Sequence, residues 1–228
     1  MPAEPDIATI AALIGEPARA AMLMALMHGH SLPAGELAYC ARISPQTASS
    51  HLAKLVEYGL LTVTVSGRHR YFALRSPEVA QVLEALSSIA PLGKVRSLRE
   101  GKQVEALRRA RTCYDHLAGK LGVALAQALV EHDYFRLEPD CCEPTQAGVA
   151  WLQQWGIDVL ALQHSRRPFA RPCVDWSERR LHIGGAVGTA ITDHLFAQAW
   201  LTRIPNTRGV LLTAAGQTAL RDELGLSF

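Results

Sequence analysis

The segment Ser44-Pro-Gln-Thr-Ala-Ser-Ser-His-Leu-Ala-Lys-Leu-Val-Glu-Tyr-Gly-Leu-Leu61 decides the fold of the first part of the chain. Ser44 is suited to cap the start of a helix, and Pro45 is suited to the first helical position, where a missing N–H breaks no hydrogen bond. Gly59 can adopt the left-handed conformation that ends a helix. The segment therefore predicts a helix from Pro45 to about Tyr58.

The two faces of this predicted helix differ in chemistry. Leu52, Leu55 and Val56 fall at helical spacing on the side that would face a core. Short polar side chains and one cation occupy the other side: Gln46, Thr47, Ser49, Ser50 and Lys54. Short side chains let a helix lie deep in the major groove of DNA, where glutamine can bond adenine through two hydrogen bonds. The polar face is therefore a candidate for base contacts.

The flanking sequence completes a recognisable arrangement. Apolar residues recur at helical spacing from Ile7 to Met27 and from Leu32 to Ala41. After the central helix, residues 61–65 and 71–74 have the pattern of two strands, with Ser66-Gly-Arg-His-Arg70 as the tip of a hairpin. Helices followed by a hairpin predict a winged helix-turn-helix.

The central helix resembles the recognition helix of the ArsR/SmtB family of bacterial transcription repressors. Ile14–Arg19 is similar to the opening segment of that family and Gly67–Tyr71 to its wing, so the resemblance covers roughly residues 7–90. It implies a homodimer that binds double-stranded DNA at a near-palindromic operator, because a two-fold protein matches a two-fold site. The residues that carry the resemblance in the helix are Ser44, Thr47, Ser49, His51, Leu52, Leu55, Gly59 and Leu60.

The predicted DNA-contacting residues come from the central helix and from the hairpin tip. Arg68 and Arg70 could reach phosphates or an adjacent minor groove. If these side chains are only solvated, the alternative is a winged-helix module for protein–protein interaction without specific DNA binding. The full predicted set is Ser44, Gln46, Thr47, Ser49, Ser50, His51, Lys54, Arg68, His69 and Arg70.

Bulk composition neither demands nor excludes a nucleic-acid partner. The 228 residues are 49% hydrophobic and 19% charged, which is globular, and 23 basic against 21 acidic residues give a net charge of only +2. Five cysteines, an odd number, do not suggest a disulfide framework, so we expect a reducing cytoplasmic location. The sequence has no run of eighteen apolar residues, and we expect no membrane partner.

The sequence divides into a DNA-binding domain at residues 1–92, a basic helical linker at 93–104 and an effector or dimerisation domain at 105–228. The basic residues around the linker are either a solvated helix face or a contact to the DNA backbone. They are Lys94, Arg96, Arg99, Lys102, Arg108, Arg109 and Arg111.

The second domain contains an internal repeat. His116–Leu125 aligns with His182–Ile191 at an offset of 66 residues, and Thr145–Gly148 matches Thr213–Gly216 further on. The repeats would span about 105–165 and 166–228, each a helix–hairpin–helix unit that buries its apolar face against the other. The predicted class is thus mainly α with small β-hairpins (α+β): a winged helix-turn-helix followed by two tandem repeats.

The repeats also place the same reactive side chains twice. Thiolate, carboxylate and imidazole together could bind a divalent metal ion, and a thiol pair could close on oxidation. The adjacent glycines would equally allow an organic effector to approach the backbone. The alternative is a purely structural role, in which the cysteines are small buried residues and the aspartates cap helices. The candidate effector or metal residues are Cys113, Asp115, His116, Cys173, Asp175 and His182.

The other three cysteines lie outside this candidate set. One of the metal sites found in the ArsR/SmtB family uses a pair of cysteines in the helix before the recognition helix. Here Ala38 stands at the first position and Cys40 alone at the second, so we expect Cys40 to be a small core residue. Cys141 and Cys142 form a vicinal pair in an apparent loop, which is either a redox-reactive or arsenical-binding pair or a chance surface pair.

Nucleophile elbows, phosphate loops and zinc-protease motifs are absent from the sequence, so we expect no enzyme. The predicted function is a sequence-specific DNA-binding transcriptional regulator, a repressor released by a metal, a small molecule or thiol oxidation.

Overall fold

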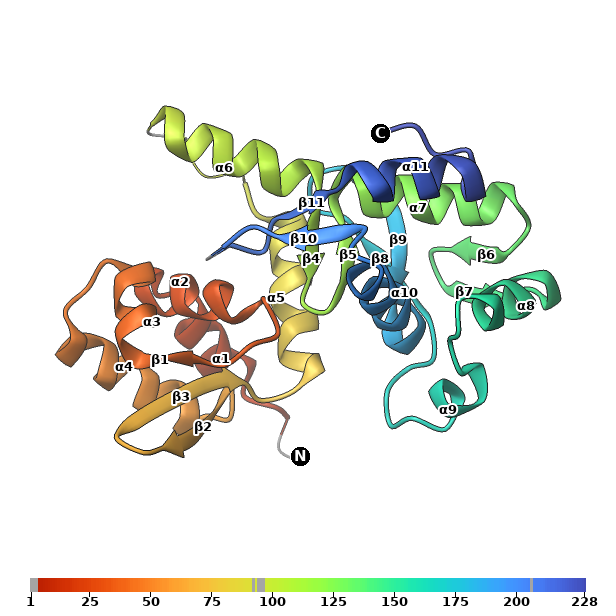
Figure 1. The fold of residues 1–228 in the computed structure, drawn as a ribbon. Helices are drawn as coiled ribbons and strands as arrows, with labels where there is room; N and C mark the ends of the chain where they lie inside the picture. The colour runs from red at the N-terminus through yellow and green to blue at the C-terminus, as the bar shows by residue number, and fades with distance from the viewer. Residues whose placement is uncertain (1–3, 92, 94–96, 206) are drawn as a thin grey trace. The chain divides into compact units, whose positions relative to one another are not determined.

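The computed structural model describes residues 4–91, 93, 97–205 and 207–228 (Figure 1). The chain divides into two compact units, unit 1 at Met1–Glu84 and unit 2 at Ala85–Phe228. The division lies eight residues before the boundary at 92 that the sequence suggests. Among the described residues no single helix is both long and apolar enough to cross a membrane, although α1 and α2, bent by 86° at their junction, pass that test as a pair.

Unit 1 has the element order of a winged helix-turn-helix. Its strands form one antiparallel sheet in the order β1-β3-β2. Its elements are α1 (Ile7–Ile14), α2 (Pro17–Leu26), β1 (Leu32–Pro33), α3 (Ala34–Ala41), α4 (Pro45–Glu57), β2 (Leu61–Ser66), β3 (His69–Leu74) and α5 (Pro77–Ile89), of which α5 continues into unit 2.

Two local expectations for unit 1 are corrected. The helix expected from Leu32 begins only at Ala34, because Leu32 and Pro33 pair as a short strand with Phe72 and Tyr71. The hairpin tip is also shorter than expected, since β2 and β3 remain paired as far as Ser66 and His69. The turn is therefore Gly67-Arg68 alone, and Gly67 takes the positive φ of +58° that such a two-residue turn requires.

The core of unit 1 follows the apolar spacing of its helices. Leu52 and Leu55 of α4 are almost fully buried, together with Ala48. They pack with side chains from α2, α3 and the sheet: Met22, Leu23, Leu26, Leu37, Leu61 and Phe72.

Unit 2 consists of two halves with the same succession of elements: hairpin, helix, hairpin, helix. The helix–hairpin–helix expected for each half is thus preceded by a further hairpin that the sequence pattern did not indicate. After α6 (Leu98–Arg109), the first half contains β4 (Arg111–Cys113), β5 (His116–Ala118), α7 (Gly119–Glu131), β6 (Phe135–Glu138), β7 (Cys141–Pro144) and α8 (Gln146–Gln154). After α9 (Val159–Gln163), the second half contains β8 (Arg171–Val174), β9 (Leu181–Gly184), α10 (Gly185–Ala197), β10 (Leu201–Arg203), β11 (Val210–Leu212) and α11 (Ala214–Leu224).

The two halves also share their local hydrogen bonds. Thr145 caps α8 by accepting from the N–H of Gly148, and Thr213 caps α11 by accepting from the N–H of Gly216. The same threonine hydroxyls donate to the carbonyls of Asp133 and Ala199 respectively.

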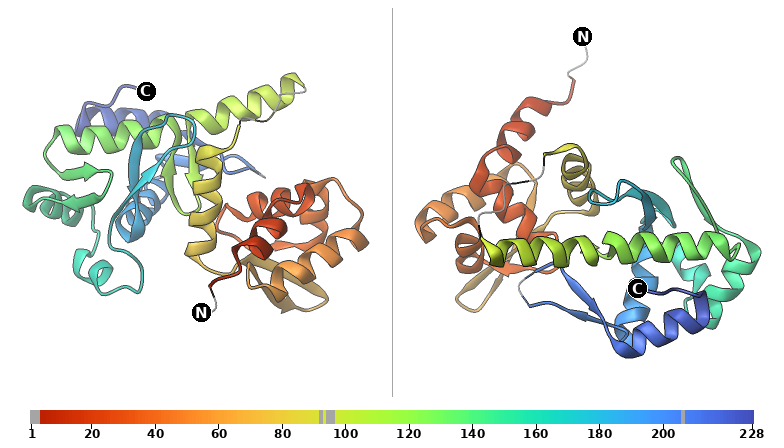
Figure 2. Two further views of the ribbon diagram at one scale, coloured as in Figure 1. Left: turned by 180° about the vertical axis from the view of Figure 1, so that it is seen from behind. Right: turned by 90° about the horizontal axis from the view of Figure 1, so that it is seen from above.

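The halves exchange contacts across their interface. Strand β5 of the first half packs on α10 of the second, while β9 of the second packs on α7 of the first (Figure 2). The N–H of Leu117 donates to the hydroxyl of Thr192 at 2.8 Å across this interface. An apolar space lined by residues of both halves, among them Leu125, Leu129 and Ile191, has a volume of about 10 Å³. That is room for about one water molecule, so an organic effector does not fit there.

Candidate functional site

Helix α4 presents the residues predicted to read DNA. The Ser44 hydroxyl accepts from the N–H of Thr47 at 3.1 Å, and Pro45 takes the first helical position. Three residues separate this helix from α3, at whose end Arg42 adopts a left-handed conformation with φ +56°. Cap, proline and turn together fix where α4 begins.

The outward face of α4 is polar, as the spacing of its leucines requires. Gln46, Thr47, Ser50 and Lys54 are exposed. Ser49 is exposed too, but its hydroxyl donates to the carbonyl of Pro45 at 2.9 Å, within the helix. The hydroxyl of Ser44 therefore caps the helix and that of Ser49 bonds within it, whereas the longer side chains of Gln46 and Lys54 extend from it.

His51 has a different environment from the other predicted DNA contacts. Its Nδ1 lies 3.3 Å from a guanidinium nitrogen of Arg19, and its Nε2 lies 3.8 Å from a carboxylate oxygen of Glu16. Arg19 in turn donates to the carbonyls of Leu13 and Ala12, so this network ties α1 and α2 to α4. The contacts of His51 with Arg19 and Glu16 thus give it a structural role inside unit 1.

The hairpin tip carries the remaining predicted contacts. Arg68, His69 and Arg70 are all exposed at the end of the β2–β3 hairpin. Arg68 lies in the turn itself, while His69 and Arg70 belong to β3 and pair with Ser66 and Val65. The tip therefore offers two guanidinium groups on a rigid ribbon.

Cys40, expected in the core, is exposed instead. Burial of part of the side chain and the charge of Glu36 raise the pKa of its thiol. Ala38 takes the buried position on α3, and because residues two apart on a helix point about 200° away from each other, Cys40 faces outward.

A second candidate site lies in unit 2, where the opening hairpins of the two halves meet. Cys113 stands directly opposite His116 in the β4–β5 pair, and Cys173 stands directly opposite His182 in the β8–β9 pair. Each hairpin thus presents one thiol and one imidazole as cross-strand neighbours. The sequence repeat placed these residues in equivalent positions but did not show that both pairs face the same point.

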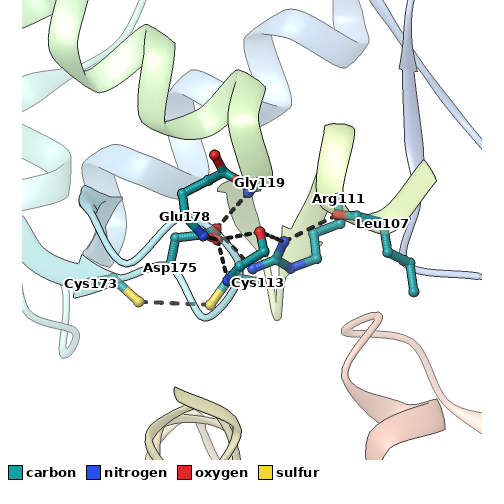
Figure 3. A network of polar contacts seen from close by, with 8 residues as sticks. Leu107, Arg111, Cys113, Gly119, Cys173, Asp175 and Glu178 are labelled. Carbon is teal, nitrogen blue, oxygen red and sulfur yellow. Dashed lines mark hydrogen bonds and ion pairs between the residues drawn. The ribbon is translucent and has the colours of Figure 1, made fainter. Parts of the chain in front are cut away.

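The four side chains form one compact buried group, called here the Cys/His cluster. One ligand atom from each of Cys113, His116, Cys173 and His182 lies within 4.8 Å of every other. The Sγ atoms of Cys113 and Cys173 are 3.8 Å apart (Figure 3). The imidazole rings stack with centroids 5.1 Å apart, and the histidines are 2% and 1% exposed.

The imidazoles of the cluster have unused nitrogen atoms. Within the described part of the chain, Nε2 of His116 and both ring nitrogens of His182 are buried without a hydrogen-bond partner. A buried polar atom left without a partner costs about 1–3 kcal/mol. The nitrogens are therefore placed at an energetic cost that a bound ligand would relieve.

Asp115 lies beside the cluster and orients it. Its Oδ1 is 3.3 Å from Nδ1 of His116, and its Oδ2 forms an ion pair of 2.6 Å with Arg167. Burial alone would raise the pKa of Asp115, but His116 and Arg167 outweigh this effect and lower it. Burial would lower the pKa of His116, yet the hydrogen bond to Asp115 and the neighbouring Cys173 raise it.

The Cys/His cluster lowers the pKa of the Cys173 thiol. The hydrogen bond with Cys113 is the largest of the effects that hold the pKa of Cys173 far below its ordinary value, and the imidazoles of His116 and His182 act in the same direction. Burial opposes them. A buried thiol with a lowered pKa next to two imidazoles is an environment typical of metal ligands.

Asp175, the other predicted carboxylate, does not join the cluster. Its Oδ2 accepts from Arg111 at 2.8 Å and from the N–H of Gly119 at 2.6 Å, and both Asp175 and Arg111 are 0% exposed (Figure 3). Burial would raise the pKa of Asp175, but the charge of Arg111 and the hydrogen bonds from Ser177 and backbone amides hold it at about 2. Asp175 thus joins the two halves through an ion pair.

The basic stretch is not one uniform face. Arg111 is fully buried, and its guanidinium also lies over the ring of Trp176 at 4.4 Å, whereas Lys102 is exposed. Lys94 and Arg96 lie outside the described residues, as does the side chain of Arg99. Sequence reasoning missed Arg111 as a structural residue because its partner is 64 positions away.

The vicinal cysteines lie on β7, away from the cluster residues in the chain. Cys142 is buried, and burial with the charges of Cys141 and Glu143 raises the pKa of its thiol to about 12. Cys141 accepts a hydrogen bond from Nε of Arg136 at 3.3 Å. A pair with one buried, protonated thiol is poorly suited to soft-metal or redox chemistry.

Comparisons with known proteins place the chain among transcription regulators. A family model described as a helix-turn-helix domain matches residues 14–64. The chain is 45% identical over 222 residues to YdfF of Bacillus subtilis (strain 168), described as an uncharacterized HTH-type transcriptional regulator, with 97% of this chain and 98% of YdfF covered. The similarity to YdfF therefore extends through both units.

Solved structures resemble a smaller part of the chain. The transcriptional repressor BigR from Xylella fastidiosa is 23% identical, covering 39% of this chain and 89% of its own, with a TM-score of 0.35. The cadmium metal-sensor CMTR from Mycobacterium tuberculosis is 25% identical, covering 40% of this chain and 94% of its own, with a TM-score of 0.33.

Proposed function

The chain belongs to the helix-turn-helix transcriptional regulators, and from this premise we propose that it is a homodimeric repressor that binds a near-palindromic operator and leaves it on binding an effector. The polar outward face of α4 carries the DNA-binding part of this proposal. Gln46 and Thr47 in the first turn of the helix are exposed and short enough to enter a major groove.

The wing supports the same orientation toward DNA. Arg68 and Arg70 are exposed at the hairpin tip, where guanidinium groups contact phosphates or a minor groove. Together with Lys54 they supply three cations per protomer to a unit that is otherwise not basic. A dimer doubles these contacts, which a protein with so few needs for specific affinity.

An exposed apolar face on helix α5 supports the proposal of a dimer. Val82, Leu86 and Ile89 are spaced on one side of the helix and are 48%, 41% and 77% exposed. An apolar helix face exposed to this extent is typical of a surface that another chain covers. The Cys/His cluster is a buried group of reactive side chains in unit 2. It supports the proposal that unit 2 responds to the effector.

The decisive experiment measures the affinity of the protein for a duplex that the wild type selects from a random-sequence pool. We expect the Gln46→Ala/Thr47→Ala variant to bind that duplex at least 10-fold more weakly, because a good base contact contributes about 1–3 kcal/mol. The matched control is Gln217→Ala/Thr218→Ala, which changes the same two residue types at exposed positions of α11.

Unchanged affinity of the Gln46→Ala/Thr47→Ala variant would show that α4 does not read the operator. If the wild type enriches no sequence and binds DNA without salt dependence, the chain is a winged-helix interaction module and the repressor proposal is wrong.

A further inference from the structure

We propose that Cys113, His116, Cys173 and His182 form a tetrahedral Zn²⁺ site that joins the two halves of unit 2. Two thiolates and two imidazoles are a donor set that zinc occupies with closed, four-coordinate geometry. The proposal concerns metal binding alone and stands whether or not the metal alters the affinity for DNA.

The spacing of the donor atoms fits the ion. Two sulfur ligands at about 2.3 Å from zinc, separated by a tetrahedral angle, lie about 3.8 Å from each other. The Sγ atoms of Cys113 and Cys173 are 3.8 Å apart, and all four candidate ligand atoms lie within 4.8 Å of one another. Only small movements of the imidazoles are then needed to close the coordination sphere.

The unpartnered nitrogens point to the same ligand. Nε2 of His116 and both ring nitrogens of His182 have no hydrogen-bond partner in the part of the chain that the structure describes, although the side chains are buried. A zinc ion would take one nitrogen from each ring. Its two positive charges would balance two thiolates, so the occupied site is neutral and suits a buried position.

Asp115 acts on the site through His116. A zinc-bound histidine donates its other ring N–H to a carboxylate, which fixes the ring and its tautomer. Asp115 is placed for this role at 3.3 Å from Nδ1 of His116, leaving Nε2 for the metal. Asp175 is not a ligand, because Arg111, Ser177 and the N–H of Gly119 occupy its oxygens.

Each half contributes one cysteine and one histidine, so neither half can complete the site alone. Binding of Zn²⁺ to the two cysteines forms two Zn–S bonds, and any proton still on a thiol passes to solvent. The metal thereby cross-links β4–β5 to β8–β9 and should stabilise the packing of the halves.

The test uses full-length protein without a histidine tag, purified under reducing conditions. Elemental analysis should find about one zinc per chain. After removal of the metal with a chelator, titration with Co²⁺ should give the intense visible absorption of tetrahedral cobalt with a thiolate charge-transfer band, saturating at one equivalent. This titration needs no variant, so it decides the proposal even if substitutions unfold the protein.

Variants then assign the ligands. Cys113→Ser and Cys173→Ser should each lose the tetrahedral Co²⁺ spectrum and the rise in melting temperature on zinc addition. Cys142→Ser is the matched control, since Cys142 is buried in the same unit but lies outside the cluster, and it should keep both.

Three results would overturn the proposal. The first is a folded wild type that neither carries zinc nor gives the tetrahedral cobalt spectrum. The second is metal retained at one equivalent by the Cys113→Ser/Cys173→Ser variant. The third is a Cys113–Cys173 disulfide, detected by mass spectrometry, in protein that never met an added oxidant.

Discussion

At the scale of single residues, two glycines show how closely the halves of unit 2 follow the same construction. A Cβ added to Gly148 would lie 1.8 Å from the carbonyl oxygen of Tyr134, and one added to Gly216 would lie 2.5 Å from the carbonyl oxygen of Trp200. Both carbonyls already accept from the capping threonine's N–H, from Thr145 and Thr213 respectively, at 2.9 Å. The close approach of each helix to the residue just before the preceding hairpin therefore depends on glycine at both positions.

We expect Gly148→Ala and Gly216→Ala each to lower the free energy of unfolding by about 1–3 kcal/mol, because the backbone must move to admit the methyl group. All four tryptophans belong to unit 2, so their fluorescence during guanidinium denaturation reports this unit alone. Gln146→Ala, at an exposed position of α8, is the control and should change little. Wild-type stability of both glycine variants would mean that the helices do not approach the carbonyls of Tyr134 and Trp200 this closely.

At the scale of elements, α4 shows why helix and wing could be predicted and the Cys/His cluster could not. The cap at Ser44, the proline after it and the apolar spacing are all local to eighteen residues. Strands β4 and β5 have three residues each, too short to show an alternating pattern. The repeat in the sequence indicated the cysteines and histidines as candidate ligands. Only the register of two separate hairpins brings them together in one cluster.

The start of α4 allows its structural and DNA-binding roles to be separated. We expect Ser44→Ala to weaken the protection of α4 against amide hydrogen exchange by about 0.5–2 kcal/mol, whereas Ser44→Asp should keep it, because aspartate caps as well as serine. Both should lose affinity for the selected duplex, but Ser44→Asp for a different reason: its negative charge would meet phosphates. Undiminished DNA binding by Ser44→Asp would place the start of α4 away from the duplex.

At the scale of the whole molecule, the position of charge matters more than its sum. Residues 1–92 carry six basic and seven acidic residues, yet three of the six basic residues, Lys54, Arg68 and Arg70, lie on the α4 face and the wing. The composition alone gave no indication of DNA binding, since seven acidic residues offset these cations, although only Glu57 among the seven belongs to α4.

This arrangement predicts a moderate dependence of DNA affinity on salt. Six cations in a dimer imply a slope of about −5 when the logarithm of the binding constant is plotted against that of the salt concentration. Arg68→Ala/Arg70→Ala should make the slope shallower by about 3.6, since four phosphate contacts are lost per dimer. Fluorescence anisotropy of the labelled duplex over a salt series measures both. A slope near −10 for the wild type would show that further cations, such as those of the basic stretch, also contact DNA.

The buried pair of Arg111 and Asp175 has a consequence for the order in which the protein is made. Sixty-four residues separate the two partners, and unit 1 precedes them both in the chain. At a ribosomal rate of roughly 5–20 residues per second, Arg111 emerges about 3–13 s before the carboxylate that neutralises it. During that interval the DNA-binding unit is already complete, while the nascent first half of unit 2 still carries an unpaired guanidinium and an uncovered apolar face, the kind of surface to which chaperones bind.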